Sequence, residues 1–382
     1  MLLQLGLLLP ALALCGLSLL TCVRVPVIIP WRATVIAGEY GHSFALGAGG
    51  WALIIWMLRG EPMGLSVAAI LFCGIAIVCF LRPVFSARRV SATLHEQMTK
   101  GWSSSGGDSS AFSLRRLWKA RPDKVAVETH EYTGGVKLDF RRAVNRDGAA
   151  PCVIMIHGGG WDSGDRVEIP FFNDWLAREG YAVASVDYRL APEHIWPAQR
   201  DDVLSAMQWL KSHASEFGID PKKFVLMGRS AGGQIASATA YTAQDESICG
   251  LIALYAPHDM PFAWSVSRPD DALNSVNLMR QYLGGPPDTP EREERYRSAS
   301  GHLNIAPARQ VPTLLMHGLI DTLVWYRHSR RFAASLTEAG QPHVLVELPW
   351  AAHAFEYNLS GPAGQLTTYA VRRFLHSVTD DS

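Results

Sequence analysis

The chain reads KFVLMGRSAGG over residues 223–233, an apolar run that leads into Ser230 within a Gly-x-Ser-x-Gly pattern. This pattern is typical of a sharp turn that lifts a serine hydroxyl clear of a sheet, and the turn has room only for small side chains at Gly228 and Gly232. A loop rich in serine and glycine could supply the same letters by chance. The apolar strand before Ser230 and the helix-compatible run 234–242 after it favour the strand-to-helix turn.

Three further apolar segments each lead into residues that acyl transfer requires. They are 151–156 before His157, Gly158, Gly159 and Gly160; 311–316 before His317 and Asp321; and 344–348 before His353. The chain order Ser230, Asp321, His353 is that of the triad in α/β-hydrolases, and it differs from the orders in chymotrypsin-like and subtilisin-like proteases.

The chemistry assigns each triad residue a role. A serine hydroxyl is a weak nucleophile at neutral pH, so His353 is expected to take the proton of Ser230 and later return it to the leaving group. Asp321 would hold the imidazole in the useful tautomer. The oxyanion needs preorganised backbone N–H donors, and the candidates are Gly158, Gly159, Gly160 and Ala231.

Other residues near these motifs have simpler interpretations. We expect His157 to fix the glycine loop rather than to carry a proton. His317 could be mistaken for the base, but it precedes the acid in the sequence. Asp259 is an alternative acid, although it follows the strand before the expected one. Trp161 and Trp196 fit core packing as well as a pocket wall.

The chain resembles the hormone-sensitive-lipase-like branch of the α/β-hydrolase esterases. The matching motifs are HGGG at 157–160, DYRLAPEH at 187–194, GRSAGG at 228–233, Asp321 and His353, and the resemblance runs from about Val125 to the C-terminus. It implies a serine carboxylesterase. The acid lies in HGLIDTLV, a form closer to small carboxylesterases, feruloyl-esterase-like and peptidase-like relatives than to the Asp-Pro-Leu form of the lipase branch. That difference leaves the subfamily and the substrate open.

The alternation of strands and helices predicts an α/β fold with a mostly parallel sheet and helices on both faces. The expected strands are 125–129, 136–142, 153–156, 182–187, 224–227, 251–255, 313–316 and 344–348. Helical patterns include 197–217 and 325–339. Catalytic residues should then gather at the carboxyl ends of the strands. The stretch 261–307 interrupts the alternation and is interpreted as a cap over the site.

The N-terminal region differs in composition from the rest. Residues 1–90 contain no Lys or Asp, and only Glu39 and Glu61 among the acids. Three uncharged apolar runs, 2–23, 43–58 and 63–81, approach or reach the roughly 20 residues that cross about 30 Å of hydrocarbon, with the middle run marginal. A signal peptide fits poorly because there is no basic segment before the first run. We therefore expect a transmembrane region of about three helices in 1–85, with two helices as the alternative.

Basic residues indicate the orientation of this region. With three spans and the catalytic domain in the cytosol, six positive residues lie inside and only Arg59 outside; the six are Arg24, Arg32, Arg82, Arg88, Arg89 and Lys100. We therefore expect an integral membrane protein with a cytoplasmic catalytic domain. Residues 86–113, rich in Ser and Gly over 101–110, are interpreted as a linker that holds the α/β-hydrolase domain of 114–382 away from the bilayer.

The remaining composition narrows the function. The formal net charge is zero without a basic patch interleaved with aromatics, so nothing suggests nucleic acid binding. None of the six cysteines has metal-ligand spacing, so no metal and no cofactor are expected. The partners expected are a small-molecule or lipid acyl ester and the lipid bilayer. An amidase, deacetylase or peptidase with the same triad, or a catalytically silent membrane-tethered binding protein, stays open.

Overall fold

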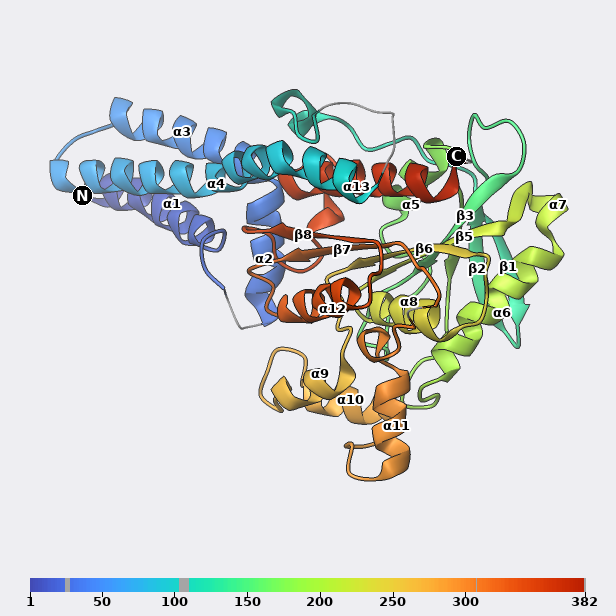
Figure 1. Ribbon diagram of the computed structural model, residues 1–382. Coiled ribbons are helices and arrows are strands. Elements are labelled where there is room, and N and C mark those ends of the chain that lie inside the picture. The colour runs from blue at the N-terminus through green and yellow to red at the C-terminus, as the bar shows by residue number, and fades with distance from the viewer. Residues whose placement is uncertain (25–27, 103–109, 307, 381–382) are drawn as a thin grey trace.

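An eight-stranded sheet is at the centre of the catalytic region in the computed structural model, which describes residues 1–24, 28–102, 110–306 and 308–380 (Figure 1). The strand order is β1-β2-β4-β3-β5-β6-β7-β8. The strands are β1 Glu128–Thr133, β2 Val136–Arg141, β3 Ala150–Ile156, β4 Ala182–Val186, β5 Ile219–Arg229, β6 Ile248–Leu254, β7 Thr313–Gly318 and β8 His343–Leu348. β2 is antiparallel to β1 and β4, and all other pairs are parallel. The eight strands are those predicted, with shifted ends.

Successive side chains of the central strands enter two cores, one on each face of the sheet. Val153 and Met155 of β3 belong to one core, and Ile154 and Ile156 belong to the other, as the period of a strand requires. α5 Pro170–Arg178 and α13 Pro362–Thr379 cover one face, while α6 Ala198–Ser212, α8 Ala231–Thr242 and α12 Arg327–Glu338 cover the other (Figure 1). The short α7 Ala214–Phe217 follows α6. This architecture is the expected α/β-hydrolase fold.

The stretch between β6 and β7 forms a separate group of short helices. They are α9 Met260–Val266, α10 Ser275–Leu283, α11 Pro290–Ser298 and the 3-10 turn η2 Gly301–Leu303. Figure 1 shows them beyond the edge of the sheet, next to α8 and α12. This group corresponds to the cap predicted for 261–307.

Three apolar helices form a bundle that projects from the catalytic region (Figure 1). α4 Met63–Gly101 packs on α1 Leu2–Leu19 and α3 Gly41–Met57. The outer surface is apolar: Leu9, Leu46, Leu71 and Val78 are between 62 and 71% exposed. By length and composition α1 and α4 could each cross a membrane. α3 has 17 residues, the lower end of what a span needs.

The linker predicted for 86–113 is only partly correct, because α4 continues without interruption to Gly101. Beyond its apolar part this helix packs on the catalytic region, with Leu94 and Met98 in the core under α13. Trp102 then contacts Phe374 edge-on, with ring centroids 5.0 Å apart. Hydrophobic burial therefore keeps the first half of the predicted linker helical and docked. Residues 103–109 lie outside the described part of the chain, and the 3-10 turn η1 Leu114–Trp118 follows.

A helix that was not predicted, α2 Ile28–Glu39, lies between the bundle and the catalytic region and runs across the direction of α4 (Figure 1). Its last residue is buried against the start of α13. The backbone N–H groups of Ala363 and Gly364 donate to Oε2 of Glu39 at 3.0 and 3.3 Å. Gly361 leaves space for this carboxylate, since a Cβ there would lie 2.2 Å from it. These hydrogen bonds attach the end of α2 to the hydrolase fold.

Candidate active site

Ser230 lies on the turn between β5 and α8, in a strained backbone conformation. Its φ and ψ are 51° and −120°, a region that residues other than glycine rarely adopt. The surrounding glycines make this conformation possible. A Cβ on Gly228 would lie 2.1 Å from the Gly232 carbonyl oxygen, and one on Gly232 would lie 2.2 Å from that of Ile156. The predicted steric reason for both glycines therefore holds in the structure.

His353 and Asp321 form a buried pair in the segments after β8 and β7. Nδ1 of His353 lies 2.7 Å from Oδ2 of Asp321. The other carboxylate oxygen accepts the backbone N–H groups of Leu323 and Val324 at 2.8 and 3.0 Å. Burial alone would raise the pKa of Asp321, but the charge of His353 and hydrogen bonds from His317 and His353 outweigh it and hold this pKa well below its ordinary range. Asp321 is thus kept ionised beside the imidazole.

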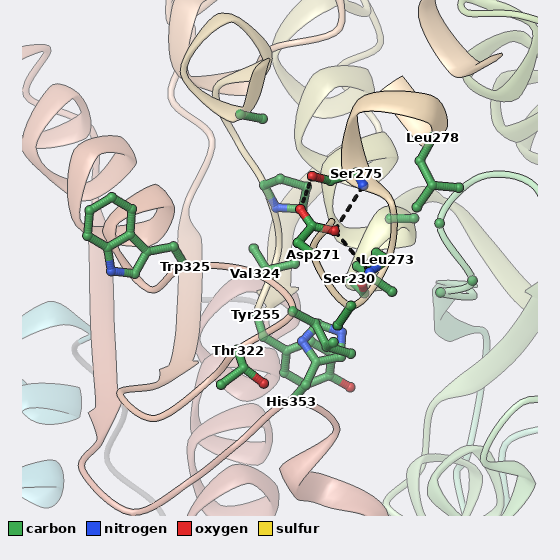
Figure 2. Close-up of a pocket in the computed structure, with 18 of the residues that line it drawn as sticks. Ser230, Tyr255, Asp271, Leu273, Ser275, Leu278, Thr322, Val324, Trp325 and His353 are labelled. Atoms are coloured by element: carbon green, nitrogen blue, oxygen red, sulfur yellow. Dashed lines mark hydrogen bonds between the residues drawn. The ribbon is translucent and has the colours of Figure 1, made fainter. Parts of the chain in front are cut away.

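A cavity of about 1110 Å³ brings the predicted residues together. Its lining includes Ser230, His353, Ala231 and the three glycines Gly158, Gly159 and Gly160. Figure 2 shows Ser230 and His353 in this cavity, together with the cap residues Asp271, Leu273, Ser275 and Leu278. The volume is slightly above the range of about 300–1,000 Å³ that is typical of small-molecule sites.

Gly159, in the loop after β3, has a conformation and surroundings that exclude a side chain. Gly159 has a φ of +109°, and a Cβ there would lie 2.1 Å from the Ser163 carbonyl oxygen. The three N–H groups of the loop are not equivalent, because that of Gly158 donates to Oε2 of Glu168 at 2.9 Å. Gly159 and Gly160 are therefore the better-placed candidates for oxyanion donors. Glu168 has no place in the sequence motifs, and only the structure reveals it.

A buried ion pair joins the residue before Ser230 to the segment after His353. Nε of Arg229 donates to Oε1 of Glu356 at 2.8 Å, and both side chains are inaccessible to solvent. The hydroxyl of Tyr255 donates to the same oxygen, and its ring centroid lies 4.4 Å from that of His353. This network joins the residue before the nucleophile to the segment that carries the base. Two features of the sequence could have indicated this pair: Arg229 is a charge inside an apolar motif, and Glu356 follows His353 by three residues. Buried charges are normally paired, so each should have a partner of opposite charge.

The alternative histidines and the alternative acid lie in surroundings that differ from those of His353 and Asp321. His157 stacks on Tyr188 at 4.2 Å between ring centroids, and burial lowers its pKa. Asp259 forms a 2.7 Å ion pair with Arg331 and lies near His302, not near His353. His317 is buried and does not line the cavity, and its Nε2 lies 3.5 Å from Oδ2 of Asp321. Its Nδ1 bonds to Ser329 at 2.8 Å.

The two tryptophans differ in position. Trp161 lines the cavity and stacks on Tyr282, with ring centroids 4.4 Å apart. Trp196 is buried, and its Nε1 donates to Oγ of Ser298 at 3.0 Å. Trp161 is thus a pocket wall and Trp196 a packing residue. Among the described residues, no three His, Cys, Asp or Glu side chains are grouped in a way that could hold a metal ion.

Residues before α3 also reach the site, which was not predicted. Arg24, Trp31 and Arg32 line the cavity. Nε of Arg24 donates to the backbone carbonyl of Asp321 at 2.9 Å, and the ring of Trp31 meets that of His353 edge-on at 6.4 Å between centroids. No motif marks these residues, because their role depends on contacts with segments about 300 residues away.

Several known proteins are similar to this chain. The probable carboxylic ester hydrolase LipM of Mycobacterium tuberculosis is 31% identical over 282 residues, which cover 69% of this chain but only 63% of LipM. The esterase LipC of the same organism is 28% identical, with 87% of this chain and 96% of LipC aligned. A bacterial heroin esterase is similar in structure, with a TM-score of 0.58 and 26% identity over 68% of this chain and 86% of that one.

A model of one protein family matches the catalytic region directly. The BD-FAE family model aligns with residues 138–336, just over half of the 382-residue chain. The matched range contains the glycine loop, Ser230 and Asp321, and the esterase relatives confirm the resemblance inferred from the motifs. The chain therefore belongs to the BD-FAE family, in the hormone-sensitive-lipase-like carboxylesterase branch of the α/β-hydrolases.

Proposed function

We propose that this chain is a membrane-anchored serine carboxylesterase, a lipase-like hydrolase that cleaves an acyl ester through an acyl-serine intermediate. The observation that carries the proposal is Ser230 on a strained turn in the same cavity as the His353–Asp321 pair. Strain at an exposed nucleophile turn is characteristic of catalytic sites. The esterase relatives support the same class of reaction.

In the proposed reaction Ser230 attacks the ester carbonyl while His353 takes the hydroxyl proton. The tetrahedral intermediate collapses when His353 gives that proton to the departing alcohol, which leaves an acyl-serine. A water molecule, deprotonated by His353, then attacks the acyl group, and His353 returns that proton to the Ser230 oxygen as the carboxylic acid is released. Asp321 stabilises the imidazolium formed in each half of the reaction, and its lowered pKa supports that role. No metal or cofactor is required.

The oxyanion of each intermediate would be held by backbone N–H groups of Gly159, Gly160 and Ala231. The N–H of Gly158 is engaged by Glu168, which supports a role for Gly158 in shaping the loop instead. Preorganised donors of this kind commonly contribute about 2.7–4 kcal/mol to the transition state each.

A substrate panel tests the proposed reaction. Full-length protein and the Ser230→Ala variant would be assayed with p-nitrophenyl esters of graded acyl length and with the matching p-nitroanilides. We expect ester hydrolysis that exceeds anilide hydrolysis and that is lost in the variant. Faster cleavage of the anilides would indicate an amidase or peptidase, and the absence of turnover with all compounds would indicate a binding protein.

The apolar bundle supports the membrane anchor. α1 and α4 have the length and composition of spans, and α3 is short enough that the bundle could contain two or three. We expect full-length protein to resist alkaline carbonate extraction. Protease treatment of sealed vesicles of known orientation tests the cytoplasmic placement, and digestion of the catalytic domain from the non-cytosolic side would contradict it.

A further inference from the structure

The bundle has a defined end on the side of the catalytic region. Oγ1 of Thr21, just after α1, donates to the carbonyl of Cys79 in α4 at 2.9 Å, and Arg82 donates to the carbonyl of Thr21. Arg82 is the first charged residue after the apolar run 63–81. The apolar parts of α1 and α4 therefore end at one level, which marks the boundary of the hydrocarbon layer for the proposed anchor.

The catalytic acid lies close to this boundary. Arg24 is three residues beyond Thr21, so at most about 11 Å of extended chain separates them. The side chain of Arg24 then reaches the carbonyl of Asp321 at 2.9 Å. A bilayer is about 40–45 Å thick in total, and its hydrocarbon core is about 30 Å thick. The polar head-group region on each side is therefore about 5–7 Å thick. One arginine side chain thus connects the edge of the bilayer with the catalytic centre.

The part of α2 next to the cavity has the residue types that favour a membrane surface. Trp31 and Arg32 both line the cavity, and the guanidinium of Arg32 lies 5.5 Å from the centroid of the Trp31 ring. Tryptophan and arginine are favoured at the head-group level, where an aromatic ring meets apolar chains and a cation meets phosphates. Because α2 runs across α4, it lies along the boundary rather than through it (Figure 1).

We propose that the active site takes its substrate directly from the bilayer: an amphiphilic acyl ester that enters past Trp31 at the level of the lipid head groups. This inference rests on the proposed esterase activity and anchor. The docked α4 supports it, because Leu94 and Met98 are buried in the catalytic core and the helix holds the domain against the membrane. Trp31 then contacts both the incoming ester and the edge of His353, and it determines specificity rather than the chemical step.

The decisive experiment compares two ways of presenting one ester. In one sample, full-length protein is reconstituted in phosphatidylcholine vesicles that contain 4-methylumbelliferyl oleate. In the other, the protein is in vesicles without the ester, and these are mixed with separate protein-free vesicles that contain the ester. We expect initial hydrolysis at least about tenfold faster when protein and ester share a bilayer. Equal initial rates, with p-nitrophenyl acetate still hydrolysed, would overturn the inference and leave the esterase. Loss of activity on both esters would overturn the proposed function and this inference with it.

A matched pair of variants tests the role of Trp31. Trp31→Ala should lower kcat/KM for the bilayer ester about tenfold, mainly through KM, and Trp31→Phe should stay within about threefold of the unaltered protein. Trp56→Ala is the control, because Trp56 is an exposed tryptophan at the opposite end of the bundle. Equal losses in Trp31→Ala and Trp56→Ala, or a loss confined to kcat, would contradict the assignment.

Discussion

The floor and the rim of the cavity are held in place by different means. The floor consists of Ser230, the glycine loop 158–160 and the Arg229–Glu356 pair beneath them, and close backbone contacts and buried charges fix it. The rim consists of Trp31 and Arg32 from α2 with Leu273 and Leu278 from the cap, and none of the four side chains is fully buried. A Cβ cannot be added at Gly159, nor at Gly228 and Gly232 on either side of Ser230, whereas rim side chains can change without movement of the backbone.

This difference separates reaction chemistry from substrate selection. Catalytic groups must be held within a fraction of an ångström, and backbone contacts provide that precision. The rim side chains, from α2 and the cap, can vary in size and charge. Substitutions in the floor should therefore change the rate for every ester, and those in the rim should change which ester is preferred.

The largest effect is expected at the nucleophile. Ser230→Ala should lower kcat by a factor on the order of 10⁴ or more for every ester, because triad members act as a unit. Circular dichroism should show an unchanged fold. The comparison would fail if the purified variant kept substantial turnover of any ester in the panel.

The next effect separates two buried acids. Asp321→Asn should reduce kcat by about 10³–10⁴ because the amide favours the wrong imidazole tautomer. Asp259→Asn serves as the matched control and should have a far smaller effect, since Asp259 pairs with Arg331 rather than His353. Steady-state kinetics of both variants measure the two effects. A larger loss in Asp259→Asn than in Asp321→Asn would show that Asp259, and not Asp321, is the catalytic acid.

A third effect concerns the buried pair in the floor. Arg229→Met leaves the carboxylate of Glu356 buried without its partner and should lower the free energy of unfolding by about 3–5 kcal/mol. The double variant Arg229→Met with Glu356→Gln should recover part of this loss, because no unpaired charge remains. Chemical denaturation measures both, and equal stabilities of the single and double variants would show that the pair is not coupled.

The last effect concerns how the attachment of the rim depends on pH. Burial raises the pKa of Glu39 from its ordinary 4.5 to about 8, even though N–H groups of Gly364 and Ala363 oppose the shift. The folded state then binds the proton more tightly than the unfolded state, so stability should fall as pH rises from about 4.5 to about 8 and level off above that. Glu39→Gln should remove this slope. Thermal unfolding between pH 4.5 and 8.5 measures how stability depends on pH. Identical slopes for the unaltered protein and the Glu39→Gln variant would show that Glu39 does not cause the slope.

Most of the floor could be predicted from the sequence because its signals are local. The signals are an apolar strand followed by Gly-x-Ser-x-Gly and two further strands followed by an acid and a histidine. They indicate the turn, the proposed triad and the sheet that positions its members. The sequence could not predict which of the three glycines keeps its N–H group available for the oxyanion. That depends on Glu168, which binds the N–H of Gly158 and lies ten residues after it, outside the motif. The Arg229–Glu356 pair joins residues 127 positions apart.

Most of the rim could not be predicted, because its contacts are long-range. α2 has 12 residues, mainly apolar, with Arg32 and Glu39 as its only charges, and it shows neither the length of a span nor a clear amphipathic period. Its place depends on N–H donors more than 320 residues away. The sequence also suggested that a chain starting near Leu114 would contain the whole hydrolase. In the structure Leu94 and Met98 belong to one of its two cores, together with Val84, so we expect a stable hydrolase to require a start before Val84.

Mapping of a fluorophosphonate adduct tests the central claim most directly. Full-length protein in vesicles is treated with the probe, which reacts only with an activated serine, and its peptides are analysed by mass spectrometry. The proposed site predicts one adduct, on Ser230, that is absent from the Ser230→Ala variant. An unlabelled folded protein, or an adduct on another serine that persists in the variant, would contradict it.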